Sequence, residues 1–215
     1  ELLGNQKTSI TDQVAVQENT VNNNGINLEN QHILNSKFSL NDGYQFNEIG
    51  VTNLERVSNP DFYRKVKDVL RTHAFIVEGE YNDTLNRLYF KVGTRINYIE
   101  KFKKTIIEPR VQFNYGINKN LNLELLGELK SQSAQQIIDL QKDYFGIEKR
   151  RWIVADDSLI PIQRSRQISL SLLYKKNDWL IDLENFYKKV NGITTSSQGF
   201  QNQLEFVRTT GGYEV

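Results

Sequence analysis

The run Glu148-Lys149-Arg150-Arg151-Trp152 is the densest group of side chains in this chain that could bind a ligand. Guanidinium groups make paired hydrogen bonds to carboxylates and phosphates, and an indole ring offers a face for stacking. Arg150, Arg151 and Trp152 could therefore hold an anionic or aromatic ligand, and the ring of Tyr144 would extend that surface. The plainer interpretation is a loop base whose cations pair with nearby carboxylates, Asp156 and Asp157.

The chain offers little for catalysis. Its two histidines, His32 and His73, lie on different predicted elements, and no serine or carboxylate accompanies them at a triad spacing. The absence of cysteine excludes disulfides, thiolate zinc sites and cysteine nucleophiles, and the scattered glycines form no phosphate-binding loop. We expect neither an enzyme nor a bound cofactor or metal. Two acidic pairs could bind calcium in a loop, although isolated pairs are usually only solvated: Asp139 with Asp143, and Asp156 with Asp157.

Composition narrows the class of protein. A net charge of +1 implies no bulk attraction to nucleic acid. No run approaches the ~18 apolar residues of a transmembrane helix. Membrane-spanning β-strands remain possible, because only alternate residues of such strands face lipid. The chain contains no methionine and opens on Glu1-Leu2-Leu3-Gly4, so we expect an internal piece of a longer precursor.

The region from Thr105 to Leu129 has the pattern of two amphipathic β-strands joined by the polar turn Asn118–Asn120. Successive side chains of a strand point to opposite faces, so this alternation gives one apolar face and one charged face. If the sheet closes into a barrel, we expect these apolar side chains to point away from the barrel interior. We expect the same direction for Ile168, Leu170 and Leu172 of a later strand. In this region the apolar set includes Val111, Phe113, Leu123 and Leu125, and the opposite set includes Arg110, Gln112, Glu124 and Glu128.

The same alternation recurs along the chain and predicts an antiparallel meander of eight strands. Asn41-Asp42-Gly43 is the strongest hairpin-turn signal, and the break in alternation at Glu48-Ile49 predicts either a bulge or a wrong register. Sequence neighbours should be sheet neighbours, because such short turns permit nothing else. The predicted strands are Ser36–Leu40, Tyr44–Leu54, Thr72–Asn82, Arg87–Glu100, Thr105–Ile117, Leu121–Lys130, Ile162–Lys175 and Trp179–Val190.

Short connections alternate with longer ones. The short polar turns are 41–43, 83–86, 118–120 and 176–178, and the connections between them are 55–70, 101–104, 131–161 and roughly 191–211. Long strands with tight turns at one end and large loops at the other are typical of an outer-membrane barrel, although a soluble sandwich also alternates. An interfacial aromatic girdle is predicted near the short turns: Tyr44, Tyr81, Tyr115, Tyr174 and Trp179.

Two of the long connections have helix signals. Asn59-Pro60-Asp61 is a good helix start, and Phe62, Val66, Val69 and Leu70 follow at helical spacing. Ser133 and Gln136 resemble a capping box, with Ile137, Ile138, Leu140 and Tyr144 behind it. We therefore expect short helices in extracellular loops.

Several segments resemble the barrel of TonB-dependent outer-membrane receptors of Bacteroidetes-type bacteria. They are Lys91–Tyr98, Ile107–Arg110, Pro161–Gln167, Glu184–Ile193, Ser197–Phe200 and Gly212–Val215. The resemblance implies a barrel of ~22 strands with a plugged lumen. Residues 1–215 would be a fragment of that single barrel domain, with about eight to ten strands and no recognisable plug.

The family further implies energised uptake of a scarce nutrient, such as an iron chelate of the siderophore or ferric citrate type. Implied partners are outer-membrane lipid and lipopolysaccharide, the rest of the barrel with its plug, and the TonB complex through that plug. The alternative is a secreted or surface-exposed β-domain that binds a partner through its long loops, Ser131–Pro161 and Asn191–Gly211. In a barrel the charged parity would face the lumen, where Arg95 and Glu128 could meet the substrate.

Overall fold

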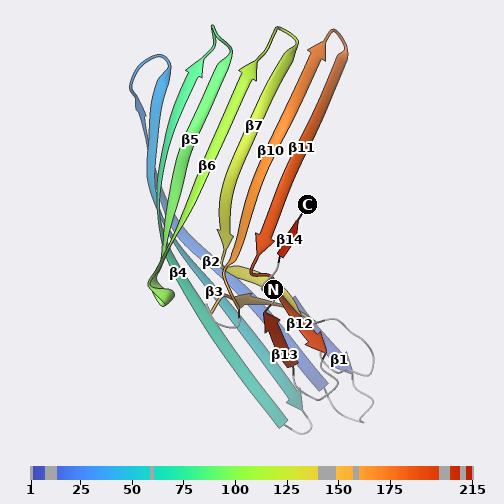
Figure 1. Cartoon of the computed structure of the whole chain (residues 1–215). Helices are drawn as coiled ribbons and strands as arrows, with labels where there is room; N and C mark the ends of the chain where they lie inside the picture. The colour runs from blue at the N-terminus through green and yellow to red at the C-terminus, as the bar shows by residue number, and fades with distance from the viewer. Residues whose placement is uncertain are drawn as a thin grey trace.

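The computed structural model describes residues 2–7, 14–58, 61–139, 149–156, 160–198, 204–208 and 212–214. Ten strands form one antiparallel sheet in the order β1-β2-β3-β4-β5-β6-β7-β10-β11-β14 (Figure 1). Their bounds are β1 Leu2–Lys7, β2 Val14–Ile33, β3 Phe38–Ser58, β4 Asp61–Asp83, β5 Leu88–Ile99, β6 Lys104–Gly116, β7 Leu121–Gln132, β10 Gln163–Lys176, β11 Trp179–Asn191 and β14 Gly212–Glu214.

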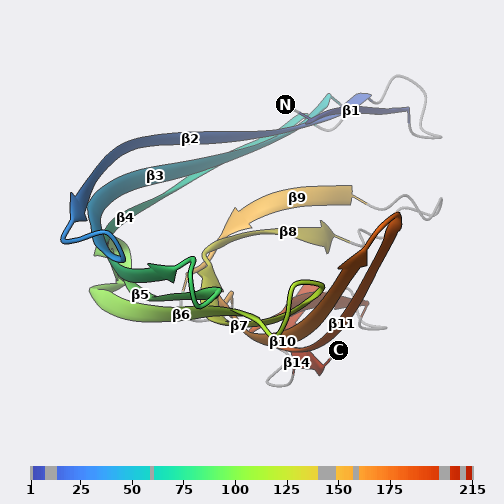
Figure 2. The ribbon, with the colours of Figure 1, turned by 90° about the horizontal axis from the view of Figure 1, so that it is seen from above.

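Two hairpins stand apart from this sheet. Strand β8 (Ala134–Asp139) pairs with β9 (Lys149–Val154), and β12 (Thr194–Gln198) pairs with β13 (Leu204–Arg208). The sheet curls into a half-barrel, and the β8–β9 hairpin lies inside the curve (Figure 2). A 3₁₀ turn, η1 (Glu100–Phe102), joins β5 to β6.

The strand register assigns the two faces of the half-barrel. Ladder partners share a face, and β5, β6 and β7 place Lys91, Gln112 and Leu126 together on the concave side. Apolar residues of the opposite parity line the convex side, where Phe75, Ile107 and Leu183 are 57%, 60% and 60% exposed. The predicted separation of an apolar and a charged face is confirmed, including the outward direction of Val111, Phe113, Leu123, Leu125, Ile168, Leu170 and Leu172.

The predicted strands from Thr72 onward are confirmed, because β4 contains Thr72–Asn82 and the bounds of β5, β6, β7, β10 and β11 lie close to those expected. The turn predicted at Asn41–Gly43 is not formed, so this prediction is wrong. These residues lie inside β3, and the chain turns at Asn35, whose Oδ1 accepts the N–H groups of Lys37 (2.9 Å) and Phe38 (3.0 Å). A Cβ on Gly43 would lie 2.8 Å from the carbonyl oxygen of Leu28, so this glycine permits close strand approach.

The bulge predicted at Glu48-Ile49 is also wrong, because β3 pairs with β4 without interruption through this region. The break in the sequence has another cause. At Ile49 and Val51 the concave face of β3 is apolar, and Val51 is buried in the cluster that receives β9. Where the β8–β9 hairpin packs, these two apolar residues of β3 therefore lie on the concave face and not on the convex face.

The predictions of a long connection at 55–70 and of a helix within it are wrong, because β3 continues to Ser58 and β4 begins at Asp61. Phe62, Val66 and Leu70 are four residues apart, a spacing that fits one face of a helix and equally one face of a strand. Residues 59 and 60 lie outside the described part of the chain. The second predicted helix is wrong at Gln136, Ile137 and Ile138, which belong to β8, and Leu140 and Tyr144 lie outside the described residues.

An apolar cluster fixes the β8–β9 hairpin to the concave face. Trp152 packs against this cluster from β9. Beside it, the N–H of Trp152 donates to Oδ1 of Asn19 (3.2 Å), and its carbonyl oxygen accepts from Nδ2 of Asn53 (3.3 Å). The Asn19 and Asn53 side chains also bond to each other. The buried members are Val51, Leu70, Ile99, Ile106, Val154, Ala155 and Ile162.

The turn between β4 and β5 is built around the carboxylate of Asp83, which is 2% exposed. Lys37 Nζ donates to it at 2.7 Å, Asn86 Nδ2 at 2.9 Å and the Tyr81 hydroxyl at 3.0 Å. The bond from Lys37, followed by those from Asn86, holds the pKa of Asp83 well below its ordinary value of 3.8. This group therefore ties the β2–β3 turn to the β4–β5 turn.

Changing Asp83→Asn should lower stability near neutral pH and have little effect in strong acid. Because the folded pKa is depressed, the contribution of Asp83 is complete above its ordinary pKa and is lost as pH falls through the folded pKa. The free energy of unfolding, measured across this pH range, should converge for variant and wild type at the acid end. Asp178→Asn, in the exposed turn after β10, is the control and should leave the profile unchanged.

Candidate functional site

A hollow on the concave face lies at the foot of the β8–β9 hairpin. Its volume is about 380 Å³, and strands β3 to β7 all contribute to it. Three cations reach it from neighbouring strands, Arg95 from β5, Arg110 from β6 and Lys130 from β7. Six further residues of the lining carry amides or hydroxyls: Asn47, Thr72, Asn97, Ser131, Gln132 and Ser133.

The buried acid of this hollow is Glu108, which is 6% exposed. It accepts the backbone N–H of Ser131 at 2.8 Å and also the Ser131 hydroxyl, which ties β6 to the end of β7. Arg95 faces Glu108 in the strand register, and its Nε donates to Oδ1 of Asn97 at 2.7 Å. These contacts hold the guanidinium of Arg95 at the wall of the hollow.

A second hollow of about 290 Å³ adjoins the first toward the short turns. Here Glu78 accepts from Lys91 at 2.7 Å and lies 3.6 Å from Arg110, while Lys130 Nζ lies 2.7 Å from Glu128. The concave face thus carries many charges that are largely paired with one another. Such a surface can bind a polar ligand through groups already held in place.

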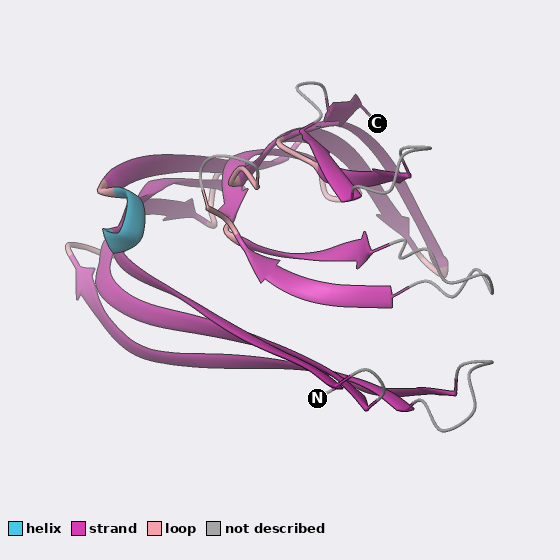
Figure 3. Cartoon of the chain, turned by 90° about the horizontal axis from the view of Figure 1, so that it is seen from below, coloured by secondary structure: helices cyan, strands magenta, loops and turns pink. Residues whose placement is uncertain are grey.

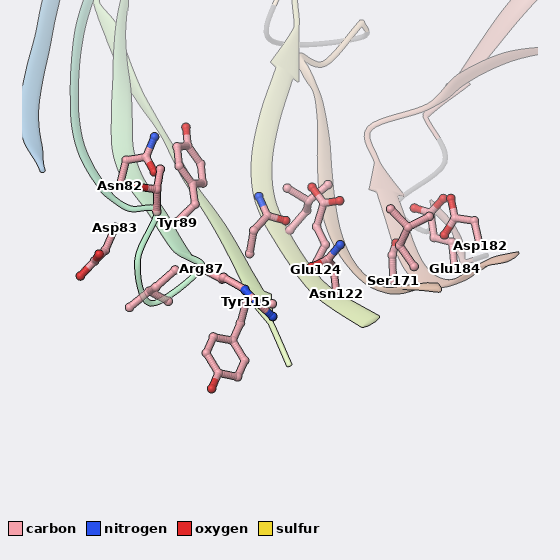
Figure 4. A pocket seen from close by; sticks show the side chains of 16 residues that line it. Asn82, Asp83, Arg87, Tyr89, Tyr115, Asn122, Glu124, Ser171, Asp182 and Glu184 are labelled. Atoms are coloured by element: carbon pink, nitrogen blue, oxygen red, sulfur yellow. The ribbon is translucent and has the colours of Figure 1, made fainter. Parts of the chain in front are cut away.

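A third hollow, of about 590 Å³, lies at the short-turn end of the concave face (Figure 4). Glu124, Asp182 and Glu184 contribute carboxylates to it, and the Glu124 carboxylate accepts from the Gln112 amide at 3.3 Å. Tyr89 and Tyr115 extend to opposite sides of the sheet here, as their parity requires. This hollow is acidic, whereas the hollow beneath the hairpin has more basic groups.

The structure places some of the candidate residues predicted from the sequence and leaves others undescribed. Arg95 and Glu128 line adjoining hollows of the concave face. The Trp152 ring packs on the apolar cluster, while Arg150 and Arg151 belong to β9 and pair with β8 through their backbones. Tyr144 and the side chains of those two arginines lie outside what the structure describes.

Sequence reasoning missed Arg110 and Lys130 as site residues. Both lie on the same face of the sheet as Arg95 and Glu128, so a strand register drawn across the turn 118–120 would have placed the four residues together.

The two histidines lie on the convex face. His73 Nδ1 lies 2.7 Å from the Tyr44 hydroxyl, and His32 Nε2 lies 2.7 Å from Asp42.

Removing the acid at the wall of the hollow should loosen the junction between β6 and β7. Glu108→Ala leaves the Ser131 N–H without its acceptor, which should cost about 1–3 kcal/mol of unfolding free energy. Glu108→Gln keeps one acceptor oxygen and is the control. Chemical denaturation of both variants checks this, and equal losses would mean that the Ser131 bond contributes nothing measurable.

No family model matches this chain, and no curated protein matches it in sequence. Within the described residues, no helix is long and apolar enough to cross a membrane. In the same part of the chain, no group of three or more histidine or carboxylate side chains is placed to hold a metal ion.

Proposed function

We propose that this chain is the barrel portion of a TonB-dependent outer-membrane receptor that takes up a scarce nutrient, with an iron chelate as the favoured class. The observation that carries the membrane assignment is the direction of the two faces. A curled sheet in water places its apolar face inside, whereas this half-barrel turns most of its apolar side chains outward and most of its charges inward, with the pair His32–Asp42 on the convex face as an exception. That arrangement suits a barrel with lipid outside and a polar interior.

Two open strand edges support a larger barrel. Among the described strands, none pairs with β2 beyond Asn19 on its outer side or with β11 before Lys189. Long open edges expose unpaired backbone groups, which a barrel removes by closure. The rest of the barrel would supply the neighbouring strands, and the plug and the TonB complex remain expectations from the family resemblance.

Aromatic side chains support two boundaries of the apolar band. Tyr81, Tyr115 and Trp179 lie on the convex face near the short turns, as expected for one interface. Tyr44 was assigned to that girdle because of the turn now shown to be wrong. It belongs to a second aromatic group, because its ring centroid lies 5.2 Å from that of Phe75 and 6.1 Å from that of His73.

Cations beyond the apolar band support contact with lipopolysaccharide. Arg164 and Arg166 lie on the convex parity of β10, past Ile168, and both are exposed. No carboxylate pairs with either one among the described side chains. Guanidinium groups at this height would bind the phosphates of the outer leaflet.

Uptake by the full-length parent tests the transport proposal. Cells carrying Arg95→Gln with Arg110→Gln should take up less labelled ferric chelate, because two guanidinium groups leave the polar wall. Lys119→Gln, at an exposed short turn, is the control. Uptake that continues without a proton gradient would contradict energised transport. A chain that is monodisperse in water without detergent would instead support a surface-exposed β-domain.

A further inference from the structure

The strands β2, β3 and β4 continue past η1, where β5 turns back into β6 (Figures 1 and 3). Pairing between β4 and β5 ends at Thr72 with Ile99. Residues 61–71 of β4 pair with β3 on one side, and no described strand pairs with them on the other. At about 3.3 Å per residue, this open edge is about 35 Å long.

This edge differs from the open edges of β2 and β11. Further barrel strands could cover those two, but β4 already has its barrel neighbour in β5. Because β5 stops at Ile99, closing the barrel would leave residues 61–71 open. Their outward N–H and C=O groups form a template to which an extended segment can add.

The turn η1 lies beside the end of this open edge where β4 begins to pair with β5. Its Lys103 has a left-handed backbone (φ 48°), and the Lys103 N–H donates to the Glu100 carbonyl at 3.2 Å. Lys101 Nζ lies 3.6 Å from Asp68 of β4, which joins η1 to the edge strand. This end of the open edge is therefore held in place by η1.

The open edge is basic although the whole chain is nearly neutral. Arg64, Lys65 and Lys67 are exposed, and none forms an ion pair with a described carboxylate. Alternate residues of a strand face opposite sides, so Lys65 and Lys67 share a face and Arg64 lies on the other. An added strand with acidic side chains would neutralise these charges across the ladder.

Lysines on an edge also discourage self-association, which is the simpler explanation of these charges. Three apolar side chains in the same segment argue for a partner. Phe62 is 48% exposed, Tyr63 62% and Val66 36%. An edge that was only protected would gain nothing from presenting these side chains to water.

We propose that the open edge of β4, residues 61–71, binds an extended acidic segment of a partner protein as an added strand. The backbone hydrogen bonds supply the affinity. Lys65 and Lys67 select for acidic side chains on one face, beside Tyr63, and Phe62 and Val66 contact apolar side chains of the added strand on the other face. This inference extends beyond nutrient uptake, because the edge is open whether or not the chain transports a ligand.

Hydrogen exchange of the whole chain in detergent micelles tests the proposal with two peptides. One alternates glutamate with valine, and the other alternates lysine with valine at the same length. The glutamate peptide should slow exchange at alternate amides of residues 61–71, and the lysine peptide should not. This comparison uses the wild-type chain, so it is informative even if a variant fails to fold.

Charge reversal gives a second measurement. Lys65→Glu with Lys67→Glu should weaken the glutamate peptide by about tenfold and favour the lysine peptide, because two attractive cross-strand pairs become repulsive. The matched control reverses two exposed lysines at the short-turn end, Lys119→Glu and Lys176→Glu, and should change neither affinity. Equal protection by both peptides, or protection confined to β2 or β11, would overturn the proposal.

Discussion

Replacing Val111 by arginine should destabilise the half-barrel in lipid vesicles by about 2–4 kcal/mol, because the proposed membrane function would place this charge against lipid. Val111 lies on the convex parity of β6, with Val92 of β5 and Gly127 of β7 as its ladder partners. Neither ladder partner carries a carboxylate that could pair with a guanidinium group at position 111. Urea-dependent folding into lipid vesicles measures the loss.

The neighbouring position supplies the matched control. Gln112 shares the backbone of Val111 but faces the concave hollow, where its amide donates to Glu124 at 3.3 Å. An arginine there meets water and carboxylates, so Gln112→Arg should be tolerated. Equal losses at positions 111 and 112 would argue against different environments on the two faces.

Shortening Leu70 to alanine should cost about 2–5 kcal/mol, the usual range for a buried leucine. Leu70 is 1% exposed and lies in the apolar cluster that receives β9. The variant should also release the hairpin, because the cluster joins Val154 and Ala155 to the concave face. Chemical denaturation measures the first effect, and hydrogen exchange at β8 and β9 measures the second.

The control for this prediction is Leu85→Ala, in the turn after β4, where the side chain is 87% exposed. That change should alter stability very little. If Leu70→Ala lowered stability while amide exchange in β8 and β9 stayed slow, the hairpin would be anchored by Asn19 and Asn53 instead of the apolar cluster.

The strands β6 and β7 were predictable because their two faces meet different environments along the whole length. Their alternation of apolar and polar residues is therefore nearly regular, and the concave face is apolar only at Ile106 and Leu126. The distal parts of β3 and β4 were not predictable in this way. There the concave face becomes apolar beneath β9, and Phe62, Val66 and Leu70 repeat at an interval that suits helix and strand alike.

Residues of the candidate site could be predicted only where the alternation along a strand decides which face they lie on. Arg95 and Glu128 could be placed on the inner face from the local pattern, and Arg110 follows from the same rule. The hairpin beside them depends on contacts between distant residues, such as the bond from Trp152 to Asn19. No local pattern encodes a contact across 133 positions.

The most direct test of the account is a scan of β6 with single nitroxide labels in lipid vesicles. The chain contains no cysteine, so each labelling site can be introduced one at a time from Ile107 to Phe113. Labels at odd positions should collide more with oxygen dissolved in lipid, and labels at even positions more with a water-soluble nickel chelate. Oxygen collisions that rise at every odd position would support an apolar face turned outward into lipid. Oxygen collisions that rise at even positions instead, or that do not alternate at all, would contradict it.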